Sequence, residues 1–183
     1  MTSASHPLWI DVVGAGDAGG QIGITFCPGK HDDSLYGGRW ERDLDVDLDV
    51  IARWQPSAMV TLIEDHEFRL LHVPLLGEGV RARNIEWHHL PIVDVEPPDA
   101  RFESRWRTSG PKLLGYLRAG GRVLVHCRGG LGRAGTVAAR LLIELDAPNK
   151  EAVALVRKAR PGAIQTSEQE RYLLNLPRPM GNR

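Results

Sequence analysis

The sequence predicts an α/β fold with a central, mainly parallel sheet, helices on both faces and an N-terminal β-hairpin. Apolar strand-like segments alternate with amphipathic helical segments, which is typical of a parallel sheet with crossover helices. At 183 residues and 42% hydrophobic composition, the chain can bury a substantial core without splitting into separate units. We therefore expect one domain across residues 1–183, with an ordered core from about residue 8 to residue 176.

Hydrophobic period and turn residues place the individual elements. Two β-rich segments around a glycine turn predict the hairpin, at residues 9–13 and 21–26. Short apolar runs predict buried strands at residues 57–63, 85–90 and 123–125. Helices are predicted at residues 40–54, 67–71, 102–117, 136–145, 150–159 and 168–174.

Two polar patterns accompany these helices. The acidic run at residues 43–49 is interpreted as the solvated face of the first helix, because apolar residues recur at helical spacing on the other face. Ser167 and Glu170 have the spacing of a capping box at the start of the last helix.

Residues 14–19 match the pattern Gly-x-Gly-x-x-Gly, which follows the first expected strand. In a dinucleotide-binding turn this pattern must open a helix. Here a β-rich segment broken by glycines follows instead, and Pro28 and Gly29 soon end it. We therefore expect a loose hairpin turn and no nicotinamide cofactor.

Charge and composition exclude several classes of partner. The formal net charge is zero, whereas nucleic-acid binding needs a basic surface that displaces counterions. The chain has no apolar span long enough to cross a membrane and no basic-then-apolar signal pattern in its first 30 residues. We expect a cytoplasmic protein that binds neither nucleic acid nor membranes; the oligomeric state stays open, with a monomer favoured.

The most informative segment, residues 126–133, begins with His126 and Cys127 at the end of an apolar strand. Glycines in the following turn let successive backbone N–H groups curl around an anion, and the next helix directs its positive end to the same point. Such surroundings favour the thiolate, so Cys127 is the predicted nucleophile. The predicted phosphate-binding residues are Arg128, Gly129, Gly130, Leu131, Gly132 and Arg133.

Arg133 closes this turn six positions after Cys127. Its planar guanidinium can hold two phosphate oxygens during transfer, which a lysine cannot do. The alternative interpretation is a buried cysteine at a strand end with an unrelated arginine nearby. The preceding strand, the three glycines and the following helix favour the catalytic interpretation.

With this His-Cys-x5-Arg segment, the chain resembles the dual-specificity branch of the protein tyrosine phosphatase superfamily. More narrowly, it is similar to the kinase-associated phosphatase group, also called the cyclin-dependent kinase inhibitor type. Three further segments carry the resemblance, at residues 26–29, 88–94 and 162–166. The resemblance implies the cysteine phosphatase fold and a cysteinyl-phosphate intermediate.

Leaving-group departure requires a general acid, and the candidates are Asp94 and Asp99 in a proline-rich loop. The resemblance selects Asp94, because Pro-Ile-Val-Asp matches the Pro-Ile-Ala-Asp acid loop of the family; Asp99 could instead cap the next helix. The same resemblance assigns Gln165 to orient the hydrolytic water. His126 is expected to hydrogen-bond within the loop and to support the thiolate.

Ala134 departs from the family pattern, in which a serine or threonine follows the arginine. That hydroxyl is expected to hydrogen-bond the departing sulfur, so its absence raises the question of how fast the phosphoenzyme breaks down. Thr136 lies two residues further along and is a candidate substitute.

We expect a phosphorylated protein or peptide as substrate, carrying phosphotyrosine and also phosphoserine or phosphothreonine. Two rivals stay open: an inositol-phosphate or phosphoinositide phosphatase, and a phospho-binding pseudophosphatase. No cofactor and no metal are expected, because the Asp65-His66-Glu67 and His88-His89 clusters lack ligand spacing. Cys27, the second of two cysteines, is expected to be an apolar filler, although an oxidised bridge to Cys127 stays open.

Overall fold

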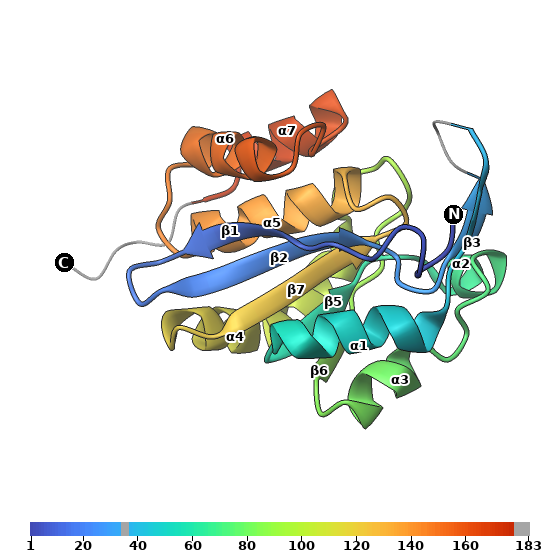
Figure 1. Ribbon diagram of the computed structural model, residues 1–183. Helices are drawn as coiled ribbons and strands as arrows, with labels where there is room; N and C mark the ends of the chain where they lie inside the picture. The colour runs from blue at the N-terminus through green and yellow to red at the C-terminus, as the bar shows by residue number, and fades with distance from the viewer. Residues whose placement is uncertain (34–36, 178–183) are drawn as a thin grey trace.

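The computed structural model describes residues 1–33 and 37–177 (Figure 1). Among these residues, five strands form the central sheet in the order β1-β2-β7-β5-β6. Strands β2, β7, β5 and β6 are parallel, and β1 pairs antiparallel with β2 as the predicted hairpin. The bounds are β1 Asp11–Ala15, β2 Gly20–Phe26, β5 Ala58–Thr61, β6 Glu86–His89 and β7 Arg122–Cys127.

Helices cover both faces of this sheet (Figure 1). In sequence order they are α1 Leu44–Trp54, α2 Asp65–Leu70, α3 Leu76–Ala82, α4 Ala100–Arg118, α5 Gly132–Glu144, α6 Asn149–Ala159 and α7 Ser167–Leu174. Helices α6 and α7 pack on α5 and form an outer layer on that side (Figure 1). A separate antiparallel pair, β3 His31–Asp33 and β4 Arg39–Glu41, lies beyond the sheet.

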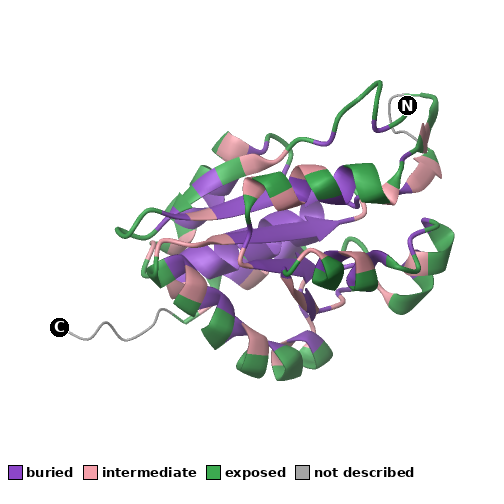
Figure 2. Cartoon of the chain, turned by 60° about the horizontal axis from the view of Figure 1, so that its bottom comes forward, coloured by how far each residue is buried: buried purple, intermediate pink, exposed green. Residues whose placement is uncertain are grey.

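Two apolar clusters lie on opposite faces of the sheet, and Figure 2 shows the buried strands between helices that are exposed on their outer sides. One cluster includes Leu113 of α4, Val137 of α5 and Val156 of α6. The other includes Ile51 of α1 and Val80 of α3. Burying both faces of the strands explains why they are continuous apolar runs without alternation.

The carboxyl ends of the parallel strands lie at one edge of the sheet. Phe26 of β2 pairs with Cys127 of β7, and Thr61 of β5 lies beside His126 and His89. In open parallel sheets, ligands bind at this edge. The topology therefore brings the end of β7 together with the loops that follow β5 and β6.

The interpretation of the acidic run as a solvated face was wrong in one respect. Asp47 is fully buried, and the Arg42 side chain donates two hydrogen bonds to its carboxylate, at 2.7 and 2.8 Å. Asp47 also accepts from the backbone N–H of Gly29. These partners explain how a carboxylate can occupy the inner face of α1, which begins at Leu44 and not at residue 40.

Other boundaries differ for local reasons. The capping box of α7 uses Thr166 and Gln169, one residue before the predicted pair, since either hydroxyl has a suitable partner three positions later. Helix α5 begins at Gly132, four residues before the expected start. Arg133 therefore lies in the first turn of a helix and not in a loop. Helix α3 and the β3–β4 pair were not predicted.

Candidate active site

Cys127 is the last residue of β7, and its side chain is buried. The backbone N–H of Gly130 donates to its sulfur at 3.2 Å, so the loop that follows the strand turns back over the thiol. Gly130 has φ +70°, and a Cβ there would lie 2.5 Å from the Thr25 carbonyl. Only glycine fits this close approach, which holds an N–H donor on the sulfur.

Helix α5 directs its N-terminus to the same loop. Leu131 is the N-cap residue and makes no side-chain capping hydrogen bond, so the first-turn amides are not occupied by a cap. The helix dipole and these amides favour an anion at this position. The earlier start of α5 strengthens the predicted anion site, because it brings the helix end to the Cys127 loop.

Arg133 is the centre of a buried ionic network. Its guanidinium donates to both oxygens of Glu67, at 2.6 and 3.0 Å, and is 1% exposed. Nη1 also donates to the Ile92 carbonyl at 3.1 Å, and Nη2 lies 2.9 Å from the Asp94 carboxylate. Although burial opposes it, the hydrogen bond to Glu67 raises the pKa of Arg133 above its ordinary value. The arginine is therefore charged and fixed.

Glu67 is a site residue that the sequence did not identify. Burial acts against ionisation, but the hydrogen bond from Arg133 holds the pKa of the Glu67 carboxyl below its usual value. The Glu67 carboxylate is also fixed by the backbone N–H of Glu64, which donates to Glu67 Oε2 at 2.7 Å. In the sequence, Glu67 belongs to the Asp65-His66-Glu67 cluster, which we considered only as a metal site and rejected for its spacing. Its position shortly after β5 is the one sequence signal that could have identified it.

The two candidate acids occupy different positions. Asp94 lies beside Arg133 with a side chain that is 54% exposed, so it contacts both the site and solvent. Asp99 is the N-cap of α4 and accepts from the backbone N–H groups of Arg101 and Phe102. The geometry places Asp94 at the candidate site and leaves Asp99 as a helix cap.

Gln165 lies in the loop before α7, against the first residue of α5. A Cβ on Gly132 would come within 2.7 Å of Gln165 Oε1. Gln169, which no sequence motif indicates, is fully buried and accepts from the backbone N–H of Gln165 at 3.0 Å. Its amide also donates to the Glu96 carbonyl at 3.2 Å. Gln169 thus connects the Gln165 loop to the Asp94 loop.

We expected His126 to hydrogen-bond within the loop and to support the thiolate; its Nε2 faces the neighbouring strand β5. Its Nε2 lies 2.8 Å from Thr61 Oγ1 on the neighbouring strand, and Trp87 Nε1 donates to the same hydroxyl at 2.8 Å. The hydroxyl can then donate its own proton to His126 Nε2 while it accepts from Trp87. Burial lowers the pKa of His126 to about 3, so the ring is neutral and is not a proton donor near pH 7.

Arg160, at the end of α6, holds the backbone of the cysteine loop from behind. Its guanidinium donates to the carbonyls of Gly130 and Gly129, at 3.0 and 3.1 Å, and pairs with Asp11 at 2.6 Å. Fixing these carbonyls restrains the peptide planes of the loop, and with them the directions of its N–H groups. The sequence does not reveal this contact, because Asp11 is 149 positions away.

Comparison with known proteins agrees with this geometry. The family model PTP-SAK, described as "Swiss Army Knife protein, DSP-PTPase phosphatase domain", matches residues 57–173. This range covers more than half of the chain and contains Cys127, Arg133, Asp94 and Gln165. The chain belongs to this phosphatase family. The predicted family and fold are confirmed.

Individual relatives of this phosphatase family are similar over the same region. Cyclin-dependent kinase inhibitor 3 of Rattus norvegicus is 37% identical over 110 residues, 58% of this chain and 50% of that protein. Protein tyrosine phosphatase type IVA 3 of Mus musculus is 36% identical over 100 residues, 55% of this chain and 54% of that protein. The chain thus spans about half the length of these curated relatives.

Among solved structures, a kinase-associated phosphatase with its catalytic cysteine replaced by serine has a TM-score of 0.77 and 27% identity. The match covers 91% of this chain and 92% of that chain.

Two features of this phosphatase chain bear on the departing sulfur. Ala134 is fully buried and supplies no hydroxyl. Thr136 Oγ1 donates to the Gly132 carbonyl at 2.8 Å, inside the helix, so its proton is directed away from Cys127. Thr136 is therefore not the substitute that the sequence left open.

Cys27 lies on the continuation of β2, whose last residue pairs with Cys127. It is buried, and burial raises the pKa of its thiol well above the ordinary value. Both cysteines are free thiols in the structure. A neutral, buried thiol fits the filler role that we expected for Cys27.

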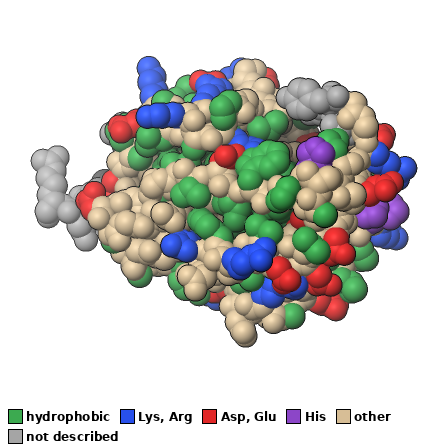
Figure 3. Space-filling model, viewed as in Figure 1, with side chains coloured by type: hydrophobic (Ala, Val, Ile, Leu, Met, Phe, Trp, Pro, Cys, Tyr) green, Lys and Arg blue, Asp and Glu red, His purple; other side chains and the backbone are tan. Residues whose placement is uncertain are grey.

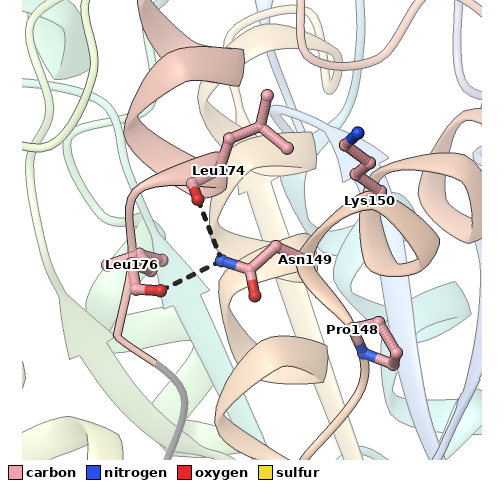
Figure 4. A pocket seen from close by; sticks show the side chains of 5 residues that line it. All are labelled: Pro148, Asn149, Lys150, Leu174 and Leu176. Carbon is pink, nitrogen blue, oxygen red and sulfur yellow. Dashed lines mark hydrogen bonds between the residues drawn. The ribbon is translucent and has the colours of Figure 1, made fainter.

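On the face shown in Figure 3, basic, acidic and hydrophobic side chains are intermixed. A surface hollow of about 490 Å³ lies between the start of α6 and the end of α7, where Asn149 donates to the carbonyls of Leu174 and Leu176 (Figure 4). This hollow is at the far end of α7 from Gln165.

Within the described ranges, no helix is long and apolar enough to span a membrane.

Proposed function

We propose that this chain is a single catalytic domain that hydrolyses phosphotyrosine, and also phosphoserine and phosphothreonine, in proteins through a cysteinyl-phosphate. One observation carries the proposal: a buried thiol receives a backbone N–H at 3.2 Å, in a loop closed by a buried arginine at the start of a helix. This arrangement combines a nucleophile with donors for the equatorial oxygens of a phosphate.

In the first step, the Cys127 thiolate attacks phosphorus, the bond to the leaving oxygen breaks, and Asp94 donates a proton to that oxygen. Both protons on Nη1 of Arg133 are used by Glu67 and Ile92, and Nη2 serves Glu67 and Asp94. A phosphate held by Nε and Nη2 would therefore take the place of Asp94 on Nη2. Substrate binding itself would release the acid from the arginine.

In the second step, water attacks phosphorus, the sulfur–phosphorus bond breaks, and Asp94 accepts the proton from the water. Gln165 orients that water from its place beside Gly132. The thiolate leaves without a hydroxyl donor from Ala134 or Thr136. We therefore expect breakdown of the phosphoenzyme to be slower than its formation. His126 supports the nucleophile as a neutral ring fixed by Thr61.

The same features make a phospho-binding protein without turnover the rival function, since Ala134 removes a hydroxyl that assists breakdown. Para-nitrophenyl phosphate and a phosphotyrosine peptide, assayed with EDTA present and with vanadate as inhibitor, separate the two. Steady, EDTA-resistant and vanadate-sensitive turnover supports the enzyme, and binding without turnover supports the rival. Cys127→Ser should abolish turnover, while Cys27→Ala, a matched change at the other thiol, should retain it.

A thiolate nucleophile needs a reducing compartment, and we accordingly place the enzyme in the cytoplasm. The proposed substrate is a phosphorylated protein or peptide, without a nucleic-acid or membrane partner. The kinase-associated relative supports this class, since its name states a phosphatase associated with a kinase.

A further inference from the structure

We propose that Asp32 restricts the site to substrates with one phosphate near the scissile bond, because it engages Arg128, the cation next to the nucleophile. This inference rests on the proposed function and specifies its substrate class. It separates a phosphoprotein substrate with an isolated phosphate from polyphosphorylated substrates, whether an inositol polyphosphate or a doubly phosphorylated peptide.

The geometry of the pair is bidentate. Arg128 Nε donates to Asp32 Oδ2 at 2.8 Å, and Nη2 donates to Asp32 Oδ1 at 2.6 Å. The Asp32 side chain is 11% exposed, whereas that of Arg128 is 39% exposed. Arg128 thus reaches the surface beside Cys127, but its fork is directed to a carboxylate of the protein and not to solvent.

Lys30, the other cation beside the cysteine loop, is also engaged. Its Nζ donates to the Arg128 carbonyl at 3.3 Å and lies 4.0 Å from Asp32 Oδ2. The ammonium lies over the rings of Phe26 and Trp40, each centroid 5.4 Å away. Burial lowers the pKa of Lys30, in keeping with this enclosed position. Lys30 therefore fixes the loop backbone and does not extend toward a ligand.

The charges around the nucleophile are matched in pairs. Arg133 faces Glu67 and Asp94, and Arg128 faces Asp32. One phosphate can be held by Arg133 and the loop amides, but a second phosphate needs another free cation. Arg128 is the cation beside the nucleophile that could bind a second phosphate. A phosphate that reached Arg128 would also be close to the Asp32 carboxylate, which would repel it.

Asp32 stays ionised at neutral pH. Burial opposes ionisation, but the hydrogen bonds from Arg128 hold the pKa of the Asp32 carboxyl below its ordinary value. The repulsion is therefore present throughout the pH range in which a phosphatase acts. Replacing Asp32 with asparagine should keep the shape of the residue while freeing a positive charge at the mouth of the site.

The test compares kcat/KM for a peptide with one phosphotyrosine and for the same peptide with a phosphoserine beside it. A soluble inositol bisphosphate serves as a third probe. Asp32→Asn should raise the ratio of doubly to singly phosphorylated peptide about tenfold, the size of one freed charge-assisted hydrogen bond. Asp33→Asn, which removes the same charge one residue further along β3, should leave the ratio unchanged.

Two further measurements make the result decisive. Adding Arg128→Gln to Asp32→Asn should abolish the gain, and high salt should reduce it because exposed charges are screened. Binding of the same three probes, measured in the Cys127→Ser background, gives the ratio without turnover. If Asp32→Asn improves the doubly phosphorylated peptide and the inositol bisphosphate alike, Asp32 excludes a second phosphate by charge alone. If it improves only the peptide, Asp32 acts on a second phosphate that a protein substrate carries.

An unchanged ratio in correctly folded Asp32→Asn, in both turnover and binding, would overturn the inference. An equal rise in Asp33→Asn would also overturn it, because the effect would then be one of net charge. If no variant turns over any probe but Asp32→Asn still gains affinity for the doubly phosphorylated peptide, the proposed function fails and the role of Asp32 stands.

Discussion

The buried pair between Glu67 and Arg133 predicts that Glu67→Gln costs both stability and rate. The side chains are 3% and 1% exposed, and two hydrogen bonds of 2.6 and 3.0 Å join them. Glutamine keeps one acceptor but turns an NH2 group toward the arginine donors, so Arg133 loses most of its counter-charge. Breaking a buried pair in this way costs about 3 kcal/mol, or roughly 6–12 °C in melting temperature.

Denaturation in urea and thermal melting measure this loss, and kcat/KM for a phosphotyrosine peptide measures the displacement of Arg133. We expect kcat/KM to fall by about 10- to 100-fold, since the guanidinium no longer has a fixed direction. Asp65→Asn is the matched control, because it removes a carboxylate from the same helix at a side chain that is 91% exposed. This control should change stability by less than about 0.5 kcal/mol.

The stability difference between wild type and Glu67→Gln should depend on pH. Because the folded-state pKa of Glu67 is held below its usual value, its stabilisation is present above the unfolded value of about 4.3. It is lost as pH falls through the lower folded-state pKa. The stability gap between wild type and Glu67→Gln should therefore be full at neutral pH and should narrow below about pH 4. A gap that is absent, or independent of pH, refutes the role assigned to this pair.

Three further variants test other parts of the site. Asp94→Asn should slow phosphotyrosine far more than an aryl phosphate with a good leaving group; equal slowing would mean that Asp94 is not the acid. If breakdown of the phosphoenzyme limits turnover, the wild type should show an initial burst of product, and Ala134→Ser should reduce the size of that burst and raise the steady-state rate about tenfold. A wild type without a burst, together with a variant that is no faster, would show that the missing hydroxyl at position 134 does not slow breakdown. Thr61→Val should cost about 1–3 kcal/mol in urea denaturation by leaving Trp87 and His126 without a partner, whereas Thr61→Ser should not; equal losses would show that the methyl group matters and not the hydroxyl.

The parts of the site that local sequence encodes were predictable. Cys127 and Arg133 are held by one strand, one turn and one helix, and their spacing together with the glycines between them indicates a phosphate site. Asp94 was identified by its motif, and the structure places it 2.9 Å from Arg133. For Cys127 and Arg133, the residues that define the geometry are neighbours in the sequence; for Asp94, the local motif was sufficient to identify the residue but not its contact with Arg133.

The supporting contacts were not predictable, because their partners are far apart in the chain. Glu67 is 66 positions from Arg133, and Asp32 is 96 positions from Arg128. The pattern of apolar residues places both carboxylates on polar positions and contains no information about which arginine each faces. Asp47 shows the same limit, since helical period cannot distinguish a solvated aspartate from a buried one with an arginine partner.

Local signals failed where two neighbouring choices were chemically equivalent. Thr166 and Ser167 both offer a hydroxyl followed three positions later by a Gln or Glu, and only the loop contacts of Gln169 decide between them. The early turn of α5 contains two glycines, whose low helix propensity favours a loop. Packing of this turn against the Gln165 loop overrides that propensity.

The central claim is that phosphate passes through Cys127. The test supplies a substrate with a radiolabelled phosphate, stops turnover with a denaturant at alkaline pH, and locates the label by peptide mass spectrometry. Label is expected on the peptide that contains Cys127, in wild type and in Cys27→Ala, and no label is expected in Cys127→Ser. Turnover above about a thousandth of wild type in Cys127→Ser, or label on any other residue, would contradict a covalent route through this thiol.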